Sequence, residues 1–285
     1  MLDGIVSGLV SGSAYAILAV CVVVIYRLVG VLNFAQGAIG AMGAYLCYSA
    51  VGAALPLAIA VLIGVAAAGL IAGFAGWVLA RWFGDPTVTV RSVVSVVLLI
   101  VLLTLGFRLF GDSPRLMPSL LPDLSFSVGG VRVSLTTVVA IVATVVIAAG
   151  LSVILHRTRV GIRLQALSER PTTVQLLGVN SRLLAVGVWV ATGMISTLAV
   201  LLVAPTRNPT FLSMSMTVVP ALAAGLLGSF TNVWIAAAAG LIIGGVEGAG
   251  ARLPIVAEYR GAIPFIIIII ALIWLRRREV WDARH

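Results

Sequence analysis

Two amide side chains interrupt an apolar run near the start of the chain, GVLNFAQGAIGAMGAY (residues 30–45). On a helix, Asn33 would share one face with Gln36, Gly37 and Gly40, because residues three, four and seven apart are neighbours there. A buried amide without a partner costs about 1 to 3 kcal/mol, so these groups should face other helices or a wet pathway rather than lipid. Two interpretations follow: a packing stripe held by interhelical hydrogen bonds, or the lining of a translocation route.

Groups for catalysis or metal binding are sparse in this sequence. The two histidines, His156 and His285, lie far apart, and no cluster of Cys, His or carboxylates has metal-ligand spacing. The usual phosphate-binding loop ends in a Lys, and all 18 basic residues are Arg. We therefore expect no enzyme activity, no bound cofactor and no ATP hydrolysis by this chain. Charged candidates for an ion path are limited to Glu247 and Arg108, which gives a proton-coupled carrier little support.

The composition places the chain in a membrane. Hydrophobic residues make up 61% of the 285 positions and charged residues only 9%, whereas soluble domains carry about 25% charged residues. Several uncharged runs reach the ~20 residues that cross a hydrocarbon core as a helix, and none shows the alternation of a transmembrane β-strand. The fold class is therefore expected to be all-α, a polytopic transmembrane helical bundle formed by a single domain over residues 1–285.

Apolar runs and the polar breaks between them predict eight or nine membrane segments. The seventh segment is short and is interrupted by Pro220, Gly225 and Gly228, so a re-entrant or broken helix is expected near 217–229. The predicted segments are 4–26, 34–50, 54–80, 92–110, 134–155, 183–203, 217–229, 232–249 and 261–275.

The positions of the arginines predict the orientation. Five arginines lie between residues 156 and 182 against the single acid Glu169, and the positive-inside rule assigns such a loop to the cytoplasm. Three more begin the tail at about 276–285, which should also be cytoplasmic, while residues 111–133 and the N-terminus should be outside. This requires an even number of crossings after residue 182, which nine full crossings satisfy. The net charge of +9 then reflects orientation rather than a nucleic-acid partner.

The cytoplasmic loop at about 156–182 contains a short amphipathic pattern of leucines and valines. Pro171 is expected in the first turn of a helix, where its missing N–H is harmless, so a short pair of helices should lie flat on the cytoplasmic face. The loop is either an ordinary positive-inside connection or a docking element. In the second case its apolar side chains enter a groove on a soluble partner, while Arg163, Glu169 and Arg170 set the register.

Two stretches resemble the permease family of bacterial branched-chain amino-acid ABC importers, and within it the LivH-like subunit. A third block, at 225–248, is similar only in part, and Gln165 and Val174 depart from the family pattern. In the first stretch, residues 30–45, the resemblance is carried by Gly30, Asn33, Phe34, Ala35, Gln36, Gly37, Gly43, Ala44 and Tyr45. In the second, residues 157–180, it is carried by Arg157, Thr158, Gly161, Ala166, Ser168, Glu169, Pro171, Gly178 and Val179.

The resemblance implies a function and a set of partners. The chain would be the permease subunit of an ATP-binding cassette importer that carries hydrophobic, branched-chain amino acids across the bacterial plasma (inner) membrane. It would pair with a second, LivM-like permease, two cytoplasmic ATP-binding subunits that hydrolyse ATP, and an extracytoplasmic solute-binding protein. ATPase closure would then pull on the loop around Glu169 and Pro171. The alternative is a stand-alone secondary carrier or channel for a small neutral or zwitterionic solute such as urea or an amide.

Overall fold

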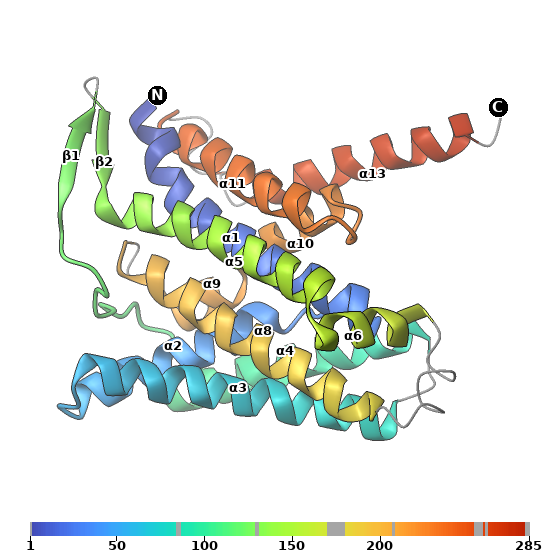
Figure 1. The fold of residues 1–285 in the computed structure, drawn as a ribbon. Helices are drawn as coiled ribbons and strands as arrows, with labels where there is room; N and C mark the ends of the chain where they lie inside the picture. Colours follow the sequence, from blue (N-terminus) through green and yellow to red (C-terminus); the bar gives the residue numbers. More distant parts are fainter. Residues whose placement is uncertain are drawn as a thin grey trace.

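The computed structural model describes residues 2–83, 87–128, 131–169, 180–206, 209–253, 259 and 262–282. Within these residues, helices are joined by short connections, and one two-stranded hairpin lies between α4 and α5 (Figure 1). The elements are α1 (Leu2–Val29), α2 (Gln36–Gly52), α3 (Leu57–Trp82), α4 (Val88–Phe110), β1 (Ser125–Val128), β2 (Val131–Ser134), α5 (Leu135–Arg157), α6 (Arg159–Glu169), α8 (Ser181–Val203), η1 (Ala204–Thr206), α9 (Phe211–Ser215), α10 (Val218–Leu227), α11 (Val233–Gly250) and α13 (Ile263–Asp282).

The helices α1, α3, α4, α5, α8 and α11 are each long and apolar enough to cross a membrane. Three further elements complete the bundle: the 17-residue α2, the α9–α10 pair and α13. The predicted polytopic helical bundle is therefore confirmed, and these elements together agree with the predicted eight or nine segments.

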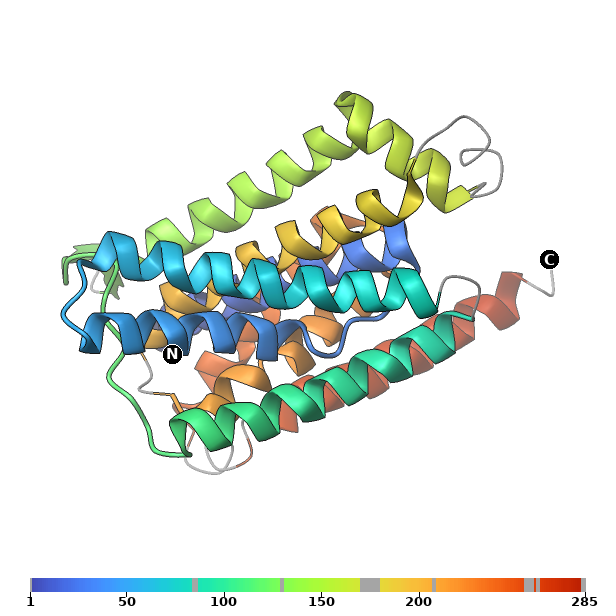
Figure 2. The same cartoon turned by 90° about the horizontal axis from the view of Figure 1, so that it is seen from below.

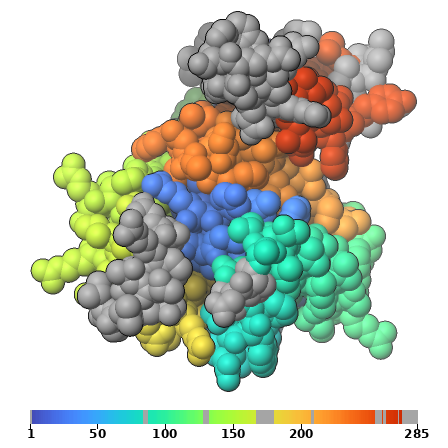
Figure 3. Space-filling view, turned by 90° about the vertical axis from the view of Figure 1, so that its right-hand side faces the viewer, coloured from blue at the N-terminus to red at the C-terminus, as the bar shows by residue number. Residues whose placement is uncertain are grey.

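Helix α1 lies at the centre of the bundle. In its most apolar stretch, 94% of the residues are buried. The helix packs against α5, α8, α10 and α11. Figure 3 shows α1 in blue, enclosed by the other helices at one end of the molecule. The sequence of α1 is apolar around its whole circumference, as expected of a helix that is buried on every side.

Glycines spaced four residues apart bring α1 and α11 into backbone contact. A Cβ atom on Gly244 of α11 would collide with the backbone of Gly12 of α1, and one on Gly248 would collide with Gly8. Small residues at this spacing let membrane helices approach closely, so that backbone packing replaces side-chain interdigitation. The central helix is therefore held by a contact that tolerates no added side chain.

Large apolar side chains cover the outward faces of α3, α4 and α5. Leu70 on α3 is 75% exposed, Val97 on α4 is 54% exposed and Val146 on α5 is 62% exposed. A soluble protein rarely exposes so much contiguous apolar surface, whereas lipid tails are as apolar as these side chains. These faces are therefore suited to contact with lipid.

The two ends of the bundle differ in their connections. At one end, Arg91 donates from Nε to the carbonyl of Phe83 (3.1 Å) and from Nη1 to the carbonyl of Val29 (3.0 Å), which ties α1 and α3 to the start of α4. Helix α6 lies at this same end (Figures 1 and 2), which we call the α6 end. At the opposite, hairpin end, the backbone N–H of Arg132 donates to Asp3 of α1 (3.3 Å).

The seventh predicted segment is a broken helix, as expected, but it passes through the bundle. Helix α9 begins at the hairpin end, where Phe211 packs edge-on against Tyr45 of α2. Helix α10 finishes at the α6 end, where Phe230 packs against Tyr26 of α1. After residue 182 the chain continues through α8, α9–α10, α11 and α13 (Figure 1), and the predicted orientation stays a prediction.

Two local features were not predicted. The loop at 111–133 contains β1 and β2, which pair antiparallel with Ser125 opposite Ser134. Strands of four residues are too short to give a clear alternation in the sequence. Helix α13 continues to Asp282, so most of the expected tail after residue 275 is helical, because the Arg and Glu residues there are good helix formers.

The contact between α1 and α11 gives a matched pair of variants. Gly244→Ala should destabilise the protein by about 1 to 3 kcal/mol, because the helices must separate to accept the methyl group. Gly245→Ala should be neutral or slightly stabilising, since the nearest atom to its Cβ is Ile5 Cγ2 at 3.6 Å. The measurement is the thermal unfolding midpoint of each purified variant in detergent. Equal midpoints would contradict the close crossing.

Candidate functional site

The predicted amide site lies on an unwound segment inside the bundle. Helix α1 ends at Val29, Gly30 adopts a left-handed φ of +70°, and the chain is not helical again until Gln36. Figure 2 shows this segment as a coil between α1 and α2. Backbone N–H and C=O groups freed in this way need other partners, because lipid offers none.

Two serines of α4 supply those partners. Ser92 Oγ accepts from the N–H of Leu32 (3.1 Å), and Ser95 Oγ accepts from the N–H of Phe34 (3.1 Å). Ser95 Oγ also donates to the carbonyl of Leu32 (2.7 Å). The unwound segment is therefore fixed to α4 at Leu32 and Phe34.

The amides themselves connect this segment to α8. Asn33 Oδ1 accepts from the N–H of Ala35 (3.0 Å), and Asn33 Nδ2 donates to Gln36 Oε1 (2.6 Å). Gln36 Nε2 in turn donates to the carbonyl of Thr192 (3.0 Å) and to Ser196 Oγ. Both amide side chains are fully buried, so a lipid-facing position is excluded and each has partners from the chain itself.

The remaining predicted residues of this site pack around the same point. A Cβ on Gly37 would collide with the carbonyl of Ser215, where α9 ends, and one on Gly40 would lie 2.9 Å from the carbonyl of Ser196 on α8. Phe34 is partly buried beside them. The structure thus gathers all five predicted residues at the start of α2, facing α4, α8 and α9. Their role in lining a route stays a prediction.

The hydroxyl groups that complete this network were not predicted from the sequence. Ser92 and Ser95 are three residues apart on α4, and Thr192 and Ser196 are four apart on α8. Each pair therefore lies on one helix face. The spacing was a usable signal, but without a fold nothing linked those faces to residues 30–36.

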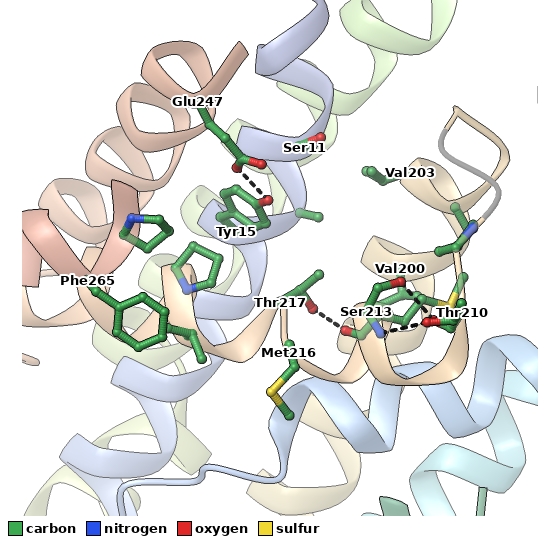
Figure 4. Close-up of a pocket in the computed structure, with 17 residues that line it drawn as sticks. Ser11, Tyr15, Val200, Val203, Thr210, Ser213, Met216, Thr217, Glu247 and Phe265 are labelled. Atoms are coloured by element: carbon green, nitrogen blue, oxygen red, sulfur yellow. Dashed lines mark hydrogen bonds between the residues drawn. The ribbon is translucent and has the colours of Figure 1, made fainter. Parts of the chain in front are cut away.

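A pocket of about 750 Å³ lies beside the break between α9 and α10 (Figure 4). Its walls come from α1, α8, α9, α10, α11 and the start of α13. Val200 and Val203 of α8, Met214 and Phe265 are apolar parts of its lining. Its size and mixed lining are those of a small-molecule site.

One side of this pocket is polar. Glu247 of α11 is only 6% exposed, and its Oε2 accepts a hydrogen bond from the hydroxyl of Tyr15 on α1 (2.8 Å). Ser11, one turn earlier on α1, is 2% exposed, and its Oγ has no hydrogen-bond partner among the described residues. Figure 4 shows these three side chains together at one edge of the pocket. The sequence had singled out Glu247 as an intramembrane acid but not its neighbours.

Helix α6 forms the described part of the predicted cytoplasmic docking element. Thr158 Oγ1 accepts from the N–H of Gly161 (3.1 Å), an N-cap interaction that starts the helix. A Cβ on Gly161 would collide with the carbonyl of Ile154, so this residue lets α6 fold sharply back on α5. Arg163 is exposed and Ala166 is half-buried.

The other predicted coupling residues fall largely beyond this helix. Glu169 is the last residue of α6. Arg170, Pro171 and Gly178 lie outside the described residues, and so does the second helix expected after Pro171. Among the described residues there is no group of three or more His, Cys, Asp or Glu side chains that could hold a metal ion.

Comparison with known proteins identifies the family. A family model described as "Branched-chain amino acid transport system / permease component" matches residues 4–272. The chain belongs to this permease family. Curated permease proteins are also similar to this chain over most of their length. BraD of Pseudomonas aeruginosa is 26% identical to it, covering 96% of this chain and 93% of BraD. LivH of Salmonella typhimurium is also 26% identical, covering 94% of this chain and 91% of LivH.

One solved structure is similar at a lower level. The structure described as PsaBC from Streptococcus pneumoniae in complex with Fab is 13% identical to the permease, with a TM-score of 0.49, and covers 93% of this chain and 89% of that one. The family match and the curated relatives confirm the predicted family, which is that of multi-pass permease subunits of the plasma (inner) membrane.

The hydrogen bonds of Ser95 give a testable consequence for the permease. Ser95→Ala should leave the N–H of Phe34 without its partner in a buried site and cost about 1 to 3 kcal/mol. Thr104→Ala on the same helix is the matched control, because Thr104 is exposed and bonds only to the Ile100 carbonyl of its own helix. Thermal unfolding midpoints in detergent compare the two. A midpoint for Ser95→Ala as high as that of the control would contradict the anchoring of the unwound segment.

Proposed function

We propose that the permease is the transmembrane subunit of an ATP-binding cassette importer for hydrophobic, branched-chain amino acids. The observation that carries the proposal is the family match over residues 4–272. The names of the curated relatives, high-affinity branched-chain amino acid transport system permease proteins, support the same cargo class. ATP would be bound and hydrolysed by separate subunits, so this chain would be a transport component and not an enzyme.

The proposed assembly has four kinds of component. The permease pairs with a second, LivM-like permease, and two ATP-binding subunits dock on the α6 end. An extracytoplasmic solute-binding protein delivers the amino acid at the hairpin end. The position of α6 at the arginine-rich end supports this sidedness, since arginines favour the cytoplasmic face.

Helix α6 is proposed to transmit the movement of the ATPases. It is joined rigidly to α5 through Thr158 and Gly161, and it also packs against α1. A push on α6 would therefore reach the central helix directly. Arg163, Ala166, Glu169 and Arg170 would form the contact surface, as in the docking interpretation of the sequence.

The start of α2 is proposed to be the element that moves. The amide network joins Asn33 and Gln36 to α8, while Gly37 touches the junction of α9 and α10. Two helices interrupted at adjacent points allow rigid halves to shift without breaking further backbone hydrogen bonds. In this proposal Phe34, Gly37 and Gly40 lie beside the translocation route. The amides of Asn33 and Gln36 hold the start of α2 against α8.

Reconstitution of the permease tests this function. We expect uptake of labelled leucine into proteoliposomes to require the second permease, both ATP-binding subunits, the solute-binding protein and ATP. Uptake by this chain alone would identify a stand-alone carrier or channel instead. Uptake of only urea or amides by the full assembly would contradict the proposed cargo.

Two charge-reversal variants, one on α6 and one away from it, test whether α6 couples the permease to the ATP-binding subunits. Arg163→Glu on α6 should lower ATP-driven uptake about ten-fold or more, because reversal of an interfacial charge costs several kcal/mol. Arg81→Glu, an exposed arginine at the end of α3, should leave uptake unchanged. Glu169→Arg should act like the first variant. ATP hydrolysis and membrane insertion should persist in all three, and equal uptake by the two arginine variants would contradict docking through α6.

A further inference from the structure

We infer that the pocket beside Glu247 binds the ammonium group of a zwitterionic cargo, with Ser11 as a second ligand to that group. This inference rests on the proposed function, because it names how the permease itself recognises an amino acid. It also separates two classes of cargo that the sequence left open, amino acids on one side and urea or neutral amides on the other.

The first observation is a carboxylate in the interior of a membrane protein. Glu247 is nearly buried and lines the pocket, and the hydroxyl of Tyr15 donates to its Oε2 (2.8 Å). An ionisable group at such a depth is costly and is a marker of a functional site. A cationic group in the pocket would make a charge-assisted hydrogen bond with this carboxylate, whereas a neutral amide would give only ordinary hydrogen bonds.

The second observation is the hydroxyl of Ser11. Ser7 and Ser13 on the same helix donate to the carbonyls of Gly4 (2.9 Å) and Leu9 (2.8 Å), as serines in apolar helices commonly do. Ser11 makes no such bond within the described chain, although it is 2% exposed and lines the pocket. A buried hydroxyl left unpaired in this way is explained by a ligand that completes it.

The packing of α1 against α11 brings the three polar groups together. Ser11 and Tyr15 are four residues apart on α1 and therefore share a face, and that face meets Glu247 across the close crossing with α11. Figure 4 shows Ser11 and Tyr15 at the same edge of the pocket as the Glu247 carboxylate. A primary ammonium has three donors, which suits a carboxylate and a hydroxyl placed together.

The rest of the pocket suits the other parts of a hydrophobic amino acid. Val200, Val203 and Met214 line an apolar wall for a branched aliphatic side chain. Thr217 and Val219 place the first turn of α10 at the same pocket. The pocket thus offers a negative group and an apolar wall.

Direct binding tests the assignment. The permease is assembled with its second permease and ATP-binding subunits in nanodiscs, without the solute-binding protein, and binding of labelled leucine is measured. Competitors are isoamylamine, which lacks the carboxylate of leucine, and 4-methylpentanoate, which lacks the ammonium. Glu247→Gln should weaken leucine and isoamylamine about 10- to 100-fold and leave 4-methylpentanoate unchanged.

Two further variants separate binding from folding. Ser11→Ala should weaken leucine about 2- to 10-fold without lowering the thermal midpoint, because the hydroxyl has no bond to lose in the empty protein. Ser7→Ala is the matched control, because Ser7 lies on the same helix, bonds to the Gly4 carbonyl (2.9 Å) and is not among the residues that line the pocket, so this variant should bind leucine normally.

The outcomes are distinct for the pocket and for the proposed function. Any of three results would overturn the ammonium site. Glu247→Gln could bind leucine as tightly as the wild type, or it could lose as much affinity for 4-methylpentanoate as for leucine. The third result is that the wild type binds no leucine at millimolar concentrations. Leucine uptake by the complete wild-type importer is measured in parallel. Uptake that persists while the pocket fails these tests would leave the proposed function standing, and its absence would overturn both.

Discussion

The structure of this permease depends on one constraint: every backbone polar group inside the membrane must find its partner within the protein. Continuous helices meet it automatically, but among the described residues the chain departs from helix at residues 30–35 and between α9 and α10. At the first break, Ser92 and Ser95 replace the missing helical partners. Each unpaired buried group would cost about 1 to 3 kcal/mol, so these serines are as necessary to the fold as any apolar contact.

The two breaks lie against one another. Gly37, just after the first, approaches the carbonyl of Ser215 at the second so closely that no side chain fits between them. The glycine-mediated crossing of α1 and α11 is packed equally closely. A bundle that combines tightly packed helices with interrupted ones can shift one part relative to the rest.

The sequence predicted the helices well because membrane spans are long, apolar and uncharged, which makes their pattern hard to mistake. It also predicted that Asn33 and Gln36 must face other helices or a wet pathway rather than lipid, since that follows from the cost of burying an amide. The partners of these amides depend on which helices become neighbours, and periodicity carries no such information. For the same reason, Ser11 looked like any other serine until the fold placed it beside Glu247, and the hairpin β1–β2 was too short to leave a pattern.

The proposed function requires that the pocket beside the break between α9 and α10 opens to the two sides of the membrane in turn as ATP is used. Cysteine accessibility tests it most directly, with Ser213→Cys in the assembled importer and the buried Cys21 and Cys47 replaced by Ala. The account predicts that a membrane-impermeant thiol reagent added outside labels this position in one nucleotide state, and the same reagent added inside labels it in another. Labelling that is the same in every nucleotide state, or that occurs from one side only, would contradict the account.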